Sequence, residues 1–253
     1  MSDIVAKDVC LDFEVYSERH RTLKETILNI TRKHTLRQER KVVPALKKVS
    51  FRITHGERVS FLGHNGAGKS TLLRTIAGIY RPTSGSIRCT GRILPLLQAA
   101  GSFNPELTGR ENIIQASALM RIPPPVALGR VDEILEFAEL SDYADVPVKY
   151  YSLGMTTRLA FSTLTSEAPD ILLLDESLVG GDLNFMAKAN QRLDEFMSSA
   201  STILMVSHDL TLVERLSTRV IWLDDGYVVA DGDPSELIAR YRDASPFRRQ
   251  KAA

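Results

Sequence analysis

The chain has 253 residues, 43% of them hydrophobic, which is enough for one sizeable core with a lobed insertion. Lys and Arg (32) nearly balance Asp and Glu (31), so the overall charge gives no reason to expect a nucleic-acid partner. The two cysteines, Cys10 and Cys89, lie in no disulfide or metal-binding motif, and no stretch approaches the roughly 20 apolar residues that span a bilayer. A membrane role would therefore come through a partner.

The N-terminal part begins with a strand and a basic segment. Residues 3–15 alternate weakly between polar and apolar side chains, which indicates the strand. Residues 19–41 carry eight Lys and Arg against two Glu, and three apolar side chains fall on one helical face, Leu23, Ile27 and Ile30. Two interpretations stay open for this segment: a solvated helical arm, or a surface near anionic lipid headgroups.

A glycine-rich motif follows the next two predicted strands. Leu46–Ile53 and Val59–Leu62 indicate strands, and Leu72–Ala77 indicates a helix closed by Gly78. Between the second strand and the helix, the chain matches the pattern G-x-x-x-x-G-K-[ST] in the segment Gly63, His64, Asn65, Gly66, Ala67, Gly68, Lys69, Ser70 and Thr71.

The residue types of this loop suit phosphate binding. Its glycines let the backbone turn tightly enough for successive N–H groups to converge on phosphate oxygens, and the following helix points its positive end at the same oxygens. Lys69 can reach the β- and γ-phosphates, and Ser70 can place its hydroxyl on Mg²⁺. The loop therefore predicts that the chain binds a nucleoside triphosphate.

The middle of the chain changes from strand to helix patterns. Pro82–Gly85 marks a tight turn, and strand signals at Ile87 and Ile93–Leu94 flank Gly91. Three helices are then expected, over 109–121, over 126–140 and after Ser152. The second of them should turn one face inward, made of Val131, Ile134, Leu135 and Ala138.

The last third alternates strands and helices again. Short apolar runs typical of a parallel sheet occur at Ile171–Leu174, Thr202–Ser207 and Val220–Leu223. Asp225-Gly226 predicts a hairpin, and Asp233 is expected to cap a terminal helix over 234–241. Together the elements predict an α/β core interrupted by an all-helical insertion.

Two carboxylates follow the apolar run Ile171–Leu174. An Asp such as Asp175, at a strand end beside a phosphate loop, is where P-loop enzymes hold Mg²⁺, and Glu176 can polarise an attacking water. The alternative is a strand end solvated by acidic side chains. The phosphate loop earlier in the chain favours the catalytic interpretation.

A Ser-x-Gly motif opens the third predicted helix. By itself, Ser152 followed by Gly154 indicates no more than a helix N-cap. The order of the motifs carries more information: phosphate loop, helical segment, Ser-x-Gly, strand with Asp-Glu, and then Ser207-His208-Asp209 after the next strand. In this order the chain resembles ATP-binding cassette (ABC) ATPases over essentially its whole length.

This resemblance implies a fold and a domain organisation. The expected fold is an α/β P-loop NTPase core, with a mixed, mainly parallel sheet and an antiparallel β subdomain, into which a helical subdomain is inserted. The core would cover about 1–104 and 166–253, and the helical subdomain about 105–165. No C-terminal carbohydrate-binding domain is expected. The resemblance implies ATP and Mg²⁺ as cofactors.

The resemblance also implies roles for individual residues. Ser152 and Gly154 would contact the γ-phosphate of ATP held by the opposite subunit, Gln98 fits the family's glutamine loop, and Asp182 fits the loop after the catalytic carboxylate. The catalytic residues would be Glu176, His208, Gln98 and Lys69, and the metal ligands would be Ser70, Gln98 and Asp175. Phe13 or Tyr16 would stack on adenine.

Several departures from the common family pattern point to a branch. His64 replaces the usual proline, and its side chain need not contact phosphate. Leu153 and Met155 depart from the common signature, and Ser177–Asp182 departs from the common loop. The motif Tyr-Ser-x-Gly-Met, the run Leu-Thr-Gly-Arg-Glu-Asn, and Gly-Asp followed by Phe185 and Lys188 resemble the ATPase subunits of polysaccharide exporters.

The branch implies partners and a location. A homodimer of ATPase subunits would act with two copies of an integral membrane permease on a lipid-linked polysaccharide, such as an O-antigen, a capsular polysaccharide, a teichoic acid or a galactan. It would lie peripherally on the cytoplasmic face of the bacterial inner membrane, without a nucleic-acid partner. Two alternatives are a soluble ABC ATPase that acts on nucleic acid or ribosomes, and a cassette that does not hydrolyse ATP.

Overall fold

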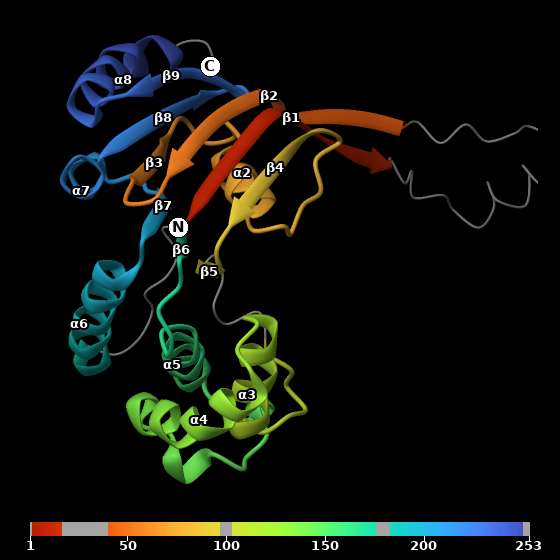
Figure 1. Ribbon diagram of the computed structural model, residues 1–253, viewed down its shortest axis with the longest axis vertical. Helices are drawn as coiled ribbons and strands as arrows, with labels where there is room; N and C mark the ends of the chain where they lie inside the picture. The colour runs from red at the N-terminus through yellow and green to blue at the C-terminus, as the bar shows by residue number, and fades with distance from the viewer. Residues whose placement is uncertain (1, 17–39, 97–102, 176–182, 250–253) are drawn as a thin grey trace, which may run out of the picture.

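The computed structural model describes residues 2–16, 40–96, 103–175 and 183–249. In these ranges the chain forms two β-sheets and a group of helices that lies apart from them, at the lower end of the view in Figure 1. Most of the basic segment 19–41 lies outside the described residues. The same holds for three predicted site residues, Gln98, Glu176 and Asp182.

The larger sheet is mainly parallel. Its six strands follow the spatial order β5 (Ile93–Leu96), β6 (Ile171–Asp175), β7 (Thr202–Val206), β3 (Arg58–Leu62), β8 (Arg219–Asp224) and β9 (Tyr227–Gly232). All neighbours are parallel except β8 and β9, which form the hairpin predicted at Asp225-Gly226. Strands β3, β7 and β8 are buried almost throughout, as expected for parallel strands covered on both faces.

The smaller sheet is antiparallel, in the order β2 (Arg40–Thr54), β1 (Asp3–Tyr16) and β4 (Ser84–Thr90). Strand β2 begins six residues before the predicted Leu46, because its pairing with β1 continues to Tyr16 and Arg40. Register shifts between Ala6 and Asp12 interrupt this long ladder. The two sheets match the mixed sheet and the antiparallel β subdomain that were expected.

The helices form two groups. Three pack on one another through their own buried core: α3 (Gly109–Leu119), α4 (Pro124–Ala138) and α5 (Leu153–Leu164), with the short turns η2 (Ser141–Tyr143) and η3 (Val148–Tyr150) between the last two. All four predicted core residues of α4 are buried. The remaining described helices pack against strands of the larger sheet: α2 (Lys69–Ile76), α6 (Leu183–Ser199), α7 (Leu210–Leu216) and α8 (Pro234–Arg249).

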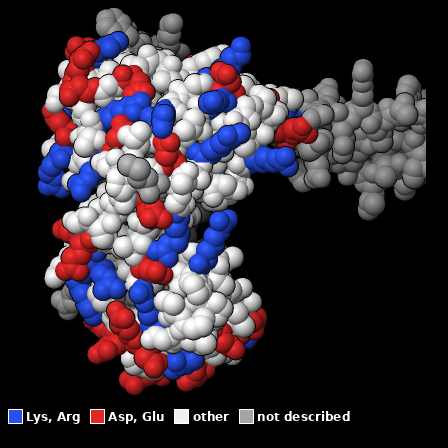
Figure 2. Space-filling view, viewed as in Figure 1, with Lys and Arg blue, Asp and Glu red and all other residues white. Residues whose placement is uncertain are grey.

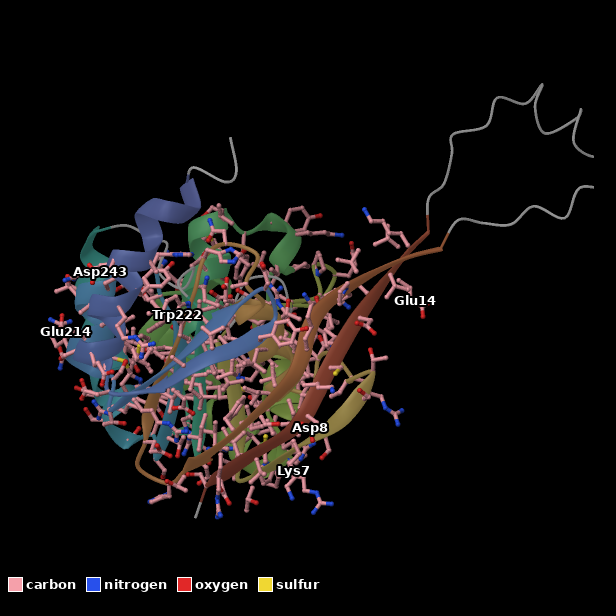
Figure 3. The ribbon with its side chains drawn as sticks, turned by 90° about the horizontal axis from the view of Figure 1, so that it is seen from above. Lys7, Asp8, Glu14, Glu214, Trp222 and Asp243 are labelled. Atoms are coloured by element: carbon pink, nitrogen blue, oxygen red, sulfur yellow. The ribbon has the colours of Figure 1, made fainter. Side chains whose placement is uncertain are left out.

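Successive side chains of a strand point to opposite faces of the sheet, and this divides the core into layers. In β7, Leu204 and Val206 join the cluster beneath the antiparallel sheet, whereas Ile203 and Met205 join the cluster under α6. On β8, Trp222 packs edge-on against Tyr241 of α8, with ring centroids 5.4 Å apart, and Figure 3 shows Trp222 beside this helix. Ala244 packs against the same cluster as Trp222, so the packed part of α8 extends beyond the predicted end at residue 241.

Helix boundaries follow local chemistry, with small corrections to the predictions. A capping box starts α3, because the Thr108 hydroxyl accepts from Glu111 N and the Glu111 carboxylate accepts from Thr108 N. The helix ends at Leu119 rather than residue 121, since Arg121 has a positive φ of 59°. Helix α4 starts at Pro124 rather than residue 126, because proline is compatible with the first helical turn.

An ion pair ties the turn after β2 to strand β8. Thr54 N donates to Glu57 Oε2 (2.5 Å), and Arg219 Nη1 donates to Glu57 Oε1 (2.9 Å). Partial burial raises the pKa of Glu57, but the hydrogen bonds from Thr54 and Arg219 outweigh burial and hold this pKa below its ordinary value of 4.5. The charged carboxylate therefore stabilises the folded chain above pH 4.5, and this contribution is lost as the pH falls through the lowered pKa.

We expect Glu57→Gln to lower the free energy of unfolding at pH 7 by about 1–2 kcal/mol, because the charged acceptor of Arg219 is lost. The difference from the wild type should shrink below pH 4.5, where the wild-type carboxyl also becomes protonated. Urea unfolding at several pH values measures it. Glu236→Gln, which breaks an exposed pair with Arg240, is the control and should have little effect. A difference that does not change with pH would contradict this account.

Candidate functional site

The glycine-rich loop lies between β3 and α2, where the sequence predicts it. Its first glycine, Gly63, has a φ of 150° and lies against the end of β8, where a Cβ would collide with the Leu223 carbonyl oxygen. Gly68, at the N-cap of α2, has a φ of 101°, and a Cβ there would stand 2.8 Å from the Ala45 carbonyl oxygen. Both positions therefore require glycine, for backbone conformation and for space.

A pocket of about 550 Å³ opens over this loop. Its lining combines the loop and the start of α2 with the ends of two parallel strands, through Ala45, Asn65, Gly66, Gly68, Lys69, Ser70, Thr71, Asp175, Val206 and His208. Most of the predicted phosphate-loop residues thus share one pocket with Asp175 and His208, although up to 143 positions separate them (208 − 65).

Lys69 supplies the positive charge of the pocket. It is only 6% exposed, and its Nζ donates to the carbonyl oxygens of Gly63 (2.6 Å) and His64 (2.9 Å). Within the described residues no side chain caps the N-terminus of α2, so its first N–H groups are available to an anion. An ammonium, a helix N-terminus and a glycine-lined loop together fit a polyphosphate.

Asp175 and His208 reach the pocket because β6 and β7 are parallel neighbours. Asp175 pairs in register with Val206, two residues before His208, so both side chains start from the same edge of the sheet. Asp209 fixes the segment behind His208: its Oδ1 accepts from Thr211 N (2.9 Å) and Leu212 N (3.2 Å) at the start of α7. A carboxylate and an imidazole thus border a polyphosphate pocket, an arrangement suited to holding a cation and moving a proton.

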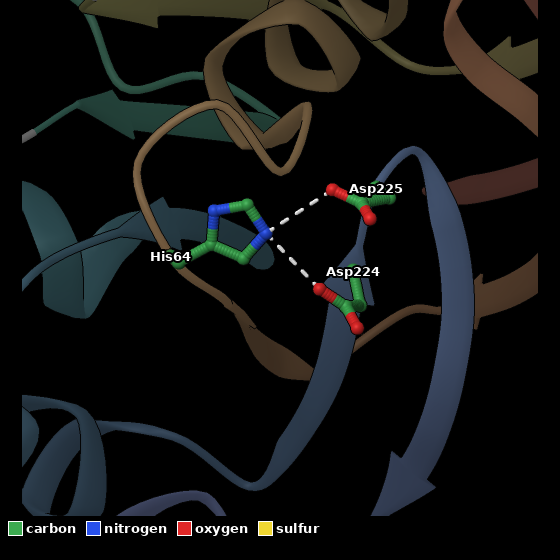
Figure 4. A group of neighbouring side chains, drawn as sticks. All are labelled: His64, Asp224 and Asp225. Carbon is green, nitrogen blue, oxygen red and sulfur yellow. Dashed lines mark hydrogen bonds and ion pairs between the residues drawn. The ribbon is translucent and has the colours of Figure 1, made fainter. Parts of the chain in front are cut away.

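His64 belongs to the loop, but its side chain points elsewhere. It faces the turn of the β8–β9 hairpin, with Nε2 3.0 Å from Asp224 Oδ1 and 3.5 Å from Asp225 Oδ1 (Figure 4). The loop therefore has two sides. Gly63, His64 and buried Ala67 do not line the pocket, whereas the other residues of Asn65–Thr71 do.

Ser152 and Gly154 lie outside the pocket, at the start of α5 in the helical group. The Ser152 hydroxyl accepts from Met155 N at 3.2 Å, so the predicted N-cap is confirmed. The residue between them, Leu153, is 79% exposed. Within one chain this motif and the phosphate loop thus belong to separate surfaces.

The structure adds three residues that the sequence analysis missed. Ala45 and Val206 line the pocket, and Asp224 contacts His64. For these three residues, the sequence contained one indication: the hairpin predicted at Asp225-Gly226, directly after Asp224. Of the two aromatic candidates for adenine, Phe13 packs edge-on against Tyr80 (5.3 Å) and is not among the pocket residues, and the side chain of Tyr16 lies outside the described part.

Comparison with known proteins adds family information. A family model described as "ABC transporter" matches residues 46–179. The O-antigen export system ATP-binding protein RfbB of Klebsiella pneumoniae is 37% identical over 237 residues, which cover 94% of this chain and 96% of that protein. The protein of the same name in Myxococcus xanthus is 38% identical over 255 residues, covering 100% of this chain but only 58% of that longer protein.

A solved structure shares the fold. It is the dimeric, post-hydrolysis state of an ATP-binding cassette bound to ADP and phosphate, with a TM-score of 0.64 and 24% identity, and the match covers 91% of this chain and 98% of that one. The similarity confirms the expected α/β P-loop NTPase fold. No helix in the described ranges has both the length and the apolar character needed to cross a bilayer.

Proposed function

The chain belongs to the ABC transporter family, and on this basis we propose that it is the ATP-hydrolysing subunit of an exporter for a lipid-linked polysaccharide. The observation that carries the proposal is the pocket in which the phosphate loop meets Asp175 and His208. A binding loop alone would hold a nucleotide, whereas the added carboxylate and imidazole suit its hydrolysis.

Each residue has a proposed role. The backbone of the loop and Lys69 would bind and orient the phosphates, and Ser70, Asp175 and Gln98 would hold Mg²⁺. When bound, Mg²⁺ offsets the negative charge of the phosphates. Glu176 accepts a proton from the attacking water, and His208 donates a hydrogen bond toward the γ-phosphate.

We propose that a second copy of the chain completes the site. Ser152 and Gly154 lie at the N-terminus of α5, and Leu153 between them is 79% exposed, as a surface for a partner would be. In a head-to-tail homodimer this surface would cover ATP on the opposite phosphate loop. ATP would then join the two copies, and hydrolysis would release them.

We expect Leu153→Asp to weaken this ATP-dependent dimer, because a charge would enter an apolar contact. About tenfold more protein should be needed for half-maximal dimerisation with ATP and Mg²⁺, while nucleotide binding to the monomer stays unchanged. Light scattering on variants that also carry Glu176→Gln measures it. Leu128→Asp, at another exposed leucine on α4, is the control; equal effects of both changes would argue against the proposed surface.

The transport partner is proposed to be an integral membrane permease in two copies. A groove of about 570 Å³ between β5 and α3 is lined partly by exposed apolar side chains, Ile79 and Leu119, which offer a docking place. The helical subdomain, about 105–165, would pass the motion of the dimer to the permease. This arrangement would place the chain on the cytoplasmic face of the bacterial inner membrane.

The names of the similar proteins support a polysaccharide as the transported substrate. Both RfbB proteins are named as ATP-binding proteins of O-antigen export systems, which supports a lipid-linked polysaccharide and does not favour a soluble ATPase acting on nucleic acid or ribosomes. A phosphate-release assay on the purified chain tests hydrolysis, and purification from solubilised membranes tests the partner. Absence of ATP hydrolysis, or nucleic acid in place of an integral membrane protein, would overturn the proposal.

A further inference from the structure

The back of the phosphate loop rests on the β8–β9 hairpin. Gly63 lies directly on the Leu223 carbonyl, and further along the loop Gly226 N donates to the Ala67 carbonyl oxygen at 3.1 Å. The hairpin is itself held by β2, because Lys47 N donates to the Gly226 carbonyl oxygen at 2.8 Å. The hairpin is therefore a fixed support on which the loop is placed.

His64 adds a side-chain bridge between the same two segments. Its Nδ1 lies 2.6 Å from the Asn65 carbonyl oxygen. Its Nε2 lies 3.0 Å from Asp224 Oδ1 (Figure 4). A carboxylate oxygen only accepts hydrogen bonds, so Nε2–H is the donor in the contact with Asp224. This hydrogen bond joins the phosphate loop to the end of β8, 160 positions further along the chain.

The charges around the bridge matter for an anionic ligand. The side chain of Asp224 is only 17% exposed, and the Asp225 carboxylate lies 3.5 Å from the same imidazole nitrogen. Two carboxylates behind a loop that binds polyphosphate would repel the ligand, and more strongly where water is partly excluded. The imidazole N–H that faces Asp224 offsets part of this repulsion, because a hydrogen bond to a carboxylate draws on its negative charge.

We propose that His64 is a positioning residue for nucleotide binding, acting through Asp224. The bridge fixes the first half of the phosphate loop on the hairpin and supplies an N–H donor to the Asp224 carboxylate, while the imidazole itself does not touch the nucleotide. This inference rests on the proposed function, because it assumes that the loop binds ATP. The inference gives a positioning role to His64, the residue that replaces the proline usual in the family.

The test measures ADP affinity by titration calorimetry at fixed pH and salt, with ATPase kinetics in parallel. His64→Ala should weaken ADP binding about five- to tenfold, and should raise the KM for ATP with little change in kcat. His64→Gln keeps a donor toward Asp224 and should lose less. The double variant His64→Ala/Asp224→Asn should bind ADP more tightly than His64→Ala alone, because one carboxylate charge behind the loop is removed.

His55→Ala is the matched control. His55 also forms a side-chain contact, with its Nδ1 3.1 Å from Ser2 Oγ, but it lies at the opposite end of β3 from the loop. This variant should leave ADP affinity unchanged. The proposal is overturned if His64→Ala lowers the melting temperature without changing affinity, or if Asp224→Asn gives no recovery. Failure of the wild type to bind ADP or ATP would instead overturn the proposed function, and this inference with it.

Discussion

Glu176→Gln is expected to reduce ATP hydrolysis by about two to four orders of magnitude while ATP stays bound. The amide has nearly the shape of the carboxylate but cannot accept a proton from the attacking water, and a general base contributes about 10²–10⁴ in rate. The phosphate loop and Asp175, which line the pocket proposed for ATP, are unchanged. ATP-bound homodimers should then accumulate, because hydrolysis no longer separates the two copies.

Phosphate release measures the first effect, and light scattering with ATP and Mg²⁺ measures the second. Glu214→Gln is the matched control, since Glu214 is exposed on α7 (Figure 3) and should leave both results at the wild-type level. Unimpaired hydrolysis by Glu176→Gln would count against the catalytic assignment. A variant that retains ATP but never self-associates would count against the shared site.

Lys69→Ala should weaken ATP binding by about 100-fold or more. Lys69 is almost fully buried under the loop, and each charge-assisted hydrogen bond that its ammonium would make to a phosphate is worth about 1.5–3 kcal/mol. The substitution also removes the donor to the Gly63 and His64 carbonyl oxygens, so the first half of the loop loses part of its support. The affinity for ATP and the conformational order of the phosphate loop should therefore decrease together.

Titration with ADP and with ATP in the absence of Mg²⁺ measures this loss without turnover. Lys7→Ala removes an exposed lysine of β1, away from the pocket, and is the control for the change in net charge (Figure 3). Circular dichroism establishes that both variants are folded. Wild-type affinity in Lys69→Ala would show that the nucleotide does not bind at this loop.

The sequence predicted most elements because their signals are local. The apolar runs before the loop and before Asp175 are buried strands, and Thr202–Val206 is another. Errors occurred where pairing or packing partners decide an end: β2 begins at Arg40 because β1 lies beside it, and α8 continues past residue 241 because Ala244 packs against the cluster of Trp222. A distant partner leaves no local pattern.

By itself the sequence determined the phosphate loop, whose spacing is dictated by backbone geometry within nine residues, and through motif order it determined the ABC family to which the chain belongs. Only the tertiary structure decided what surrounds the loop. Parallel pairing of β6 and β7 brings Asp175 and His208 to one pocket, and the hairpin places Asp224 beside His64 across 160 residues. Contacts at such separation arise from packing of sheets and turns, which no short window of sequence contains.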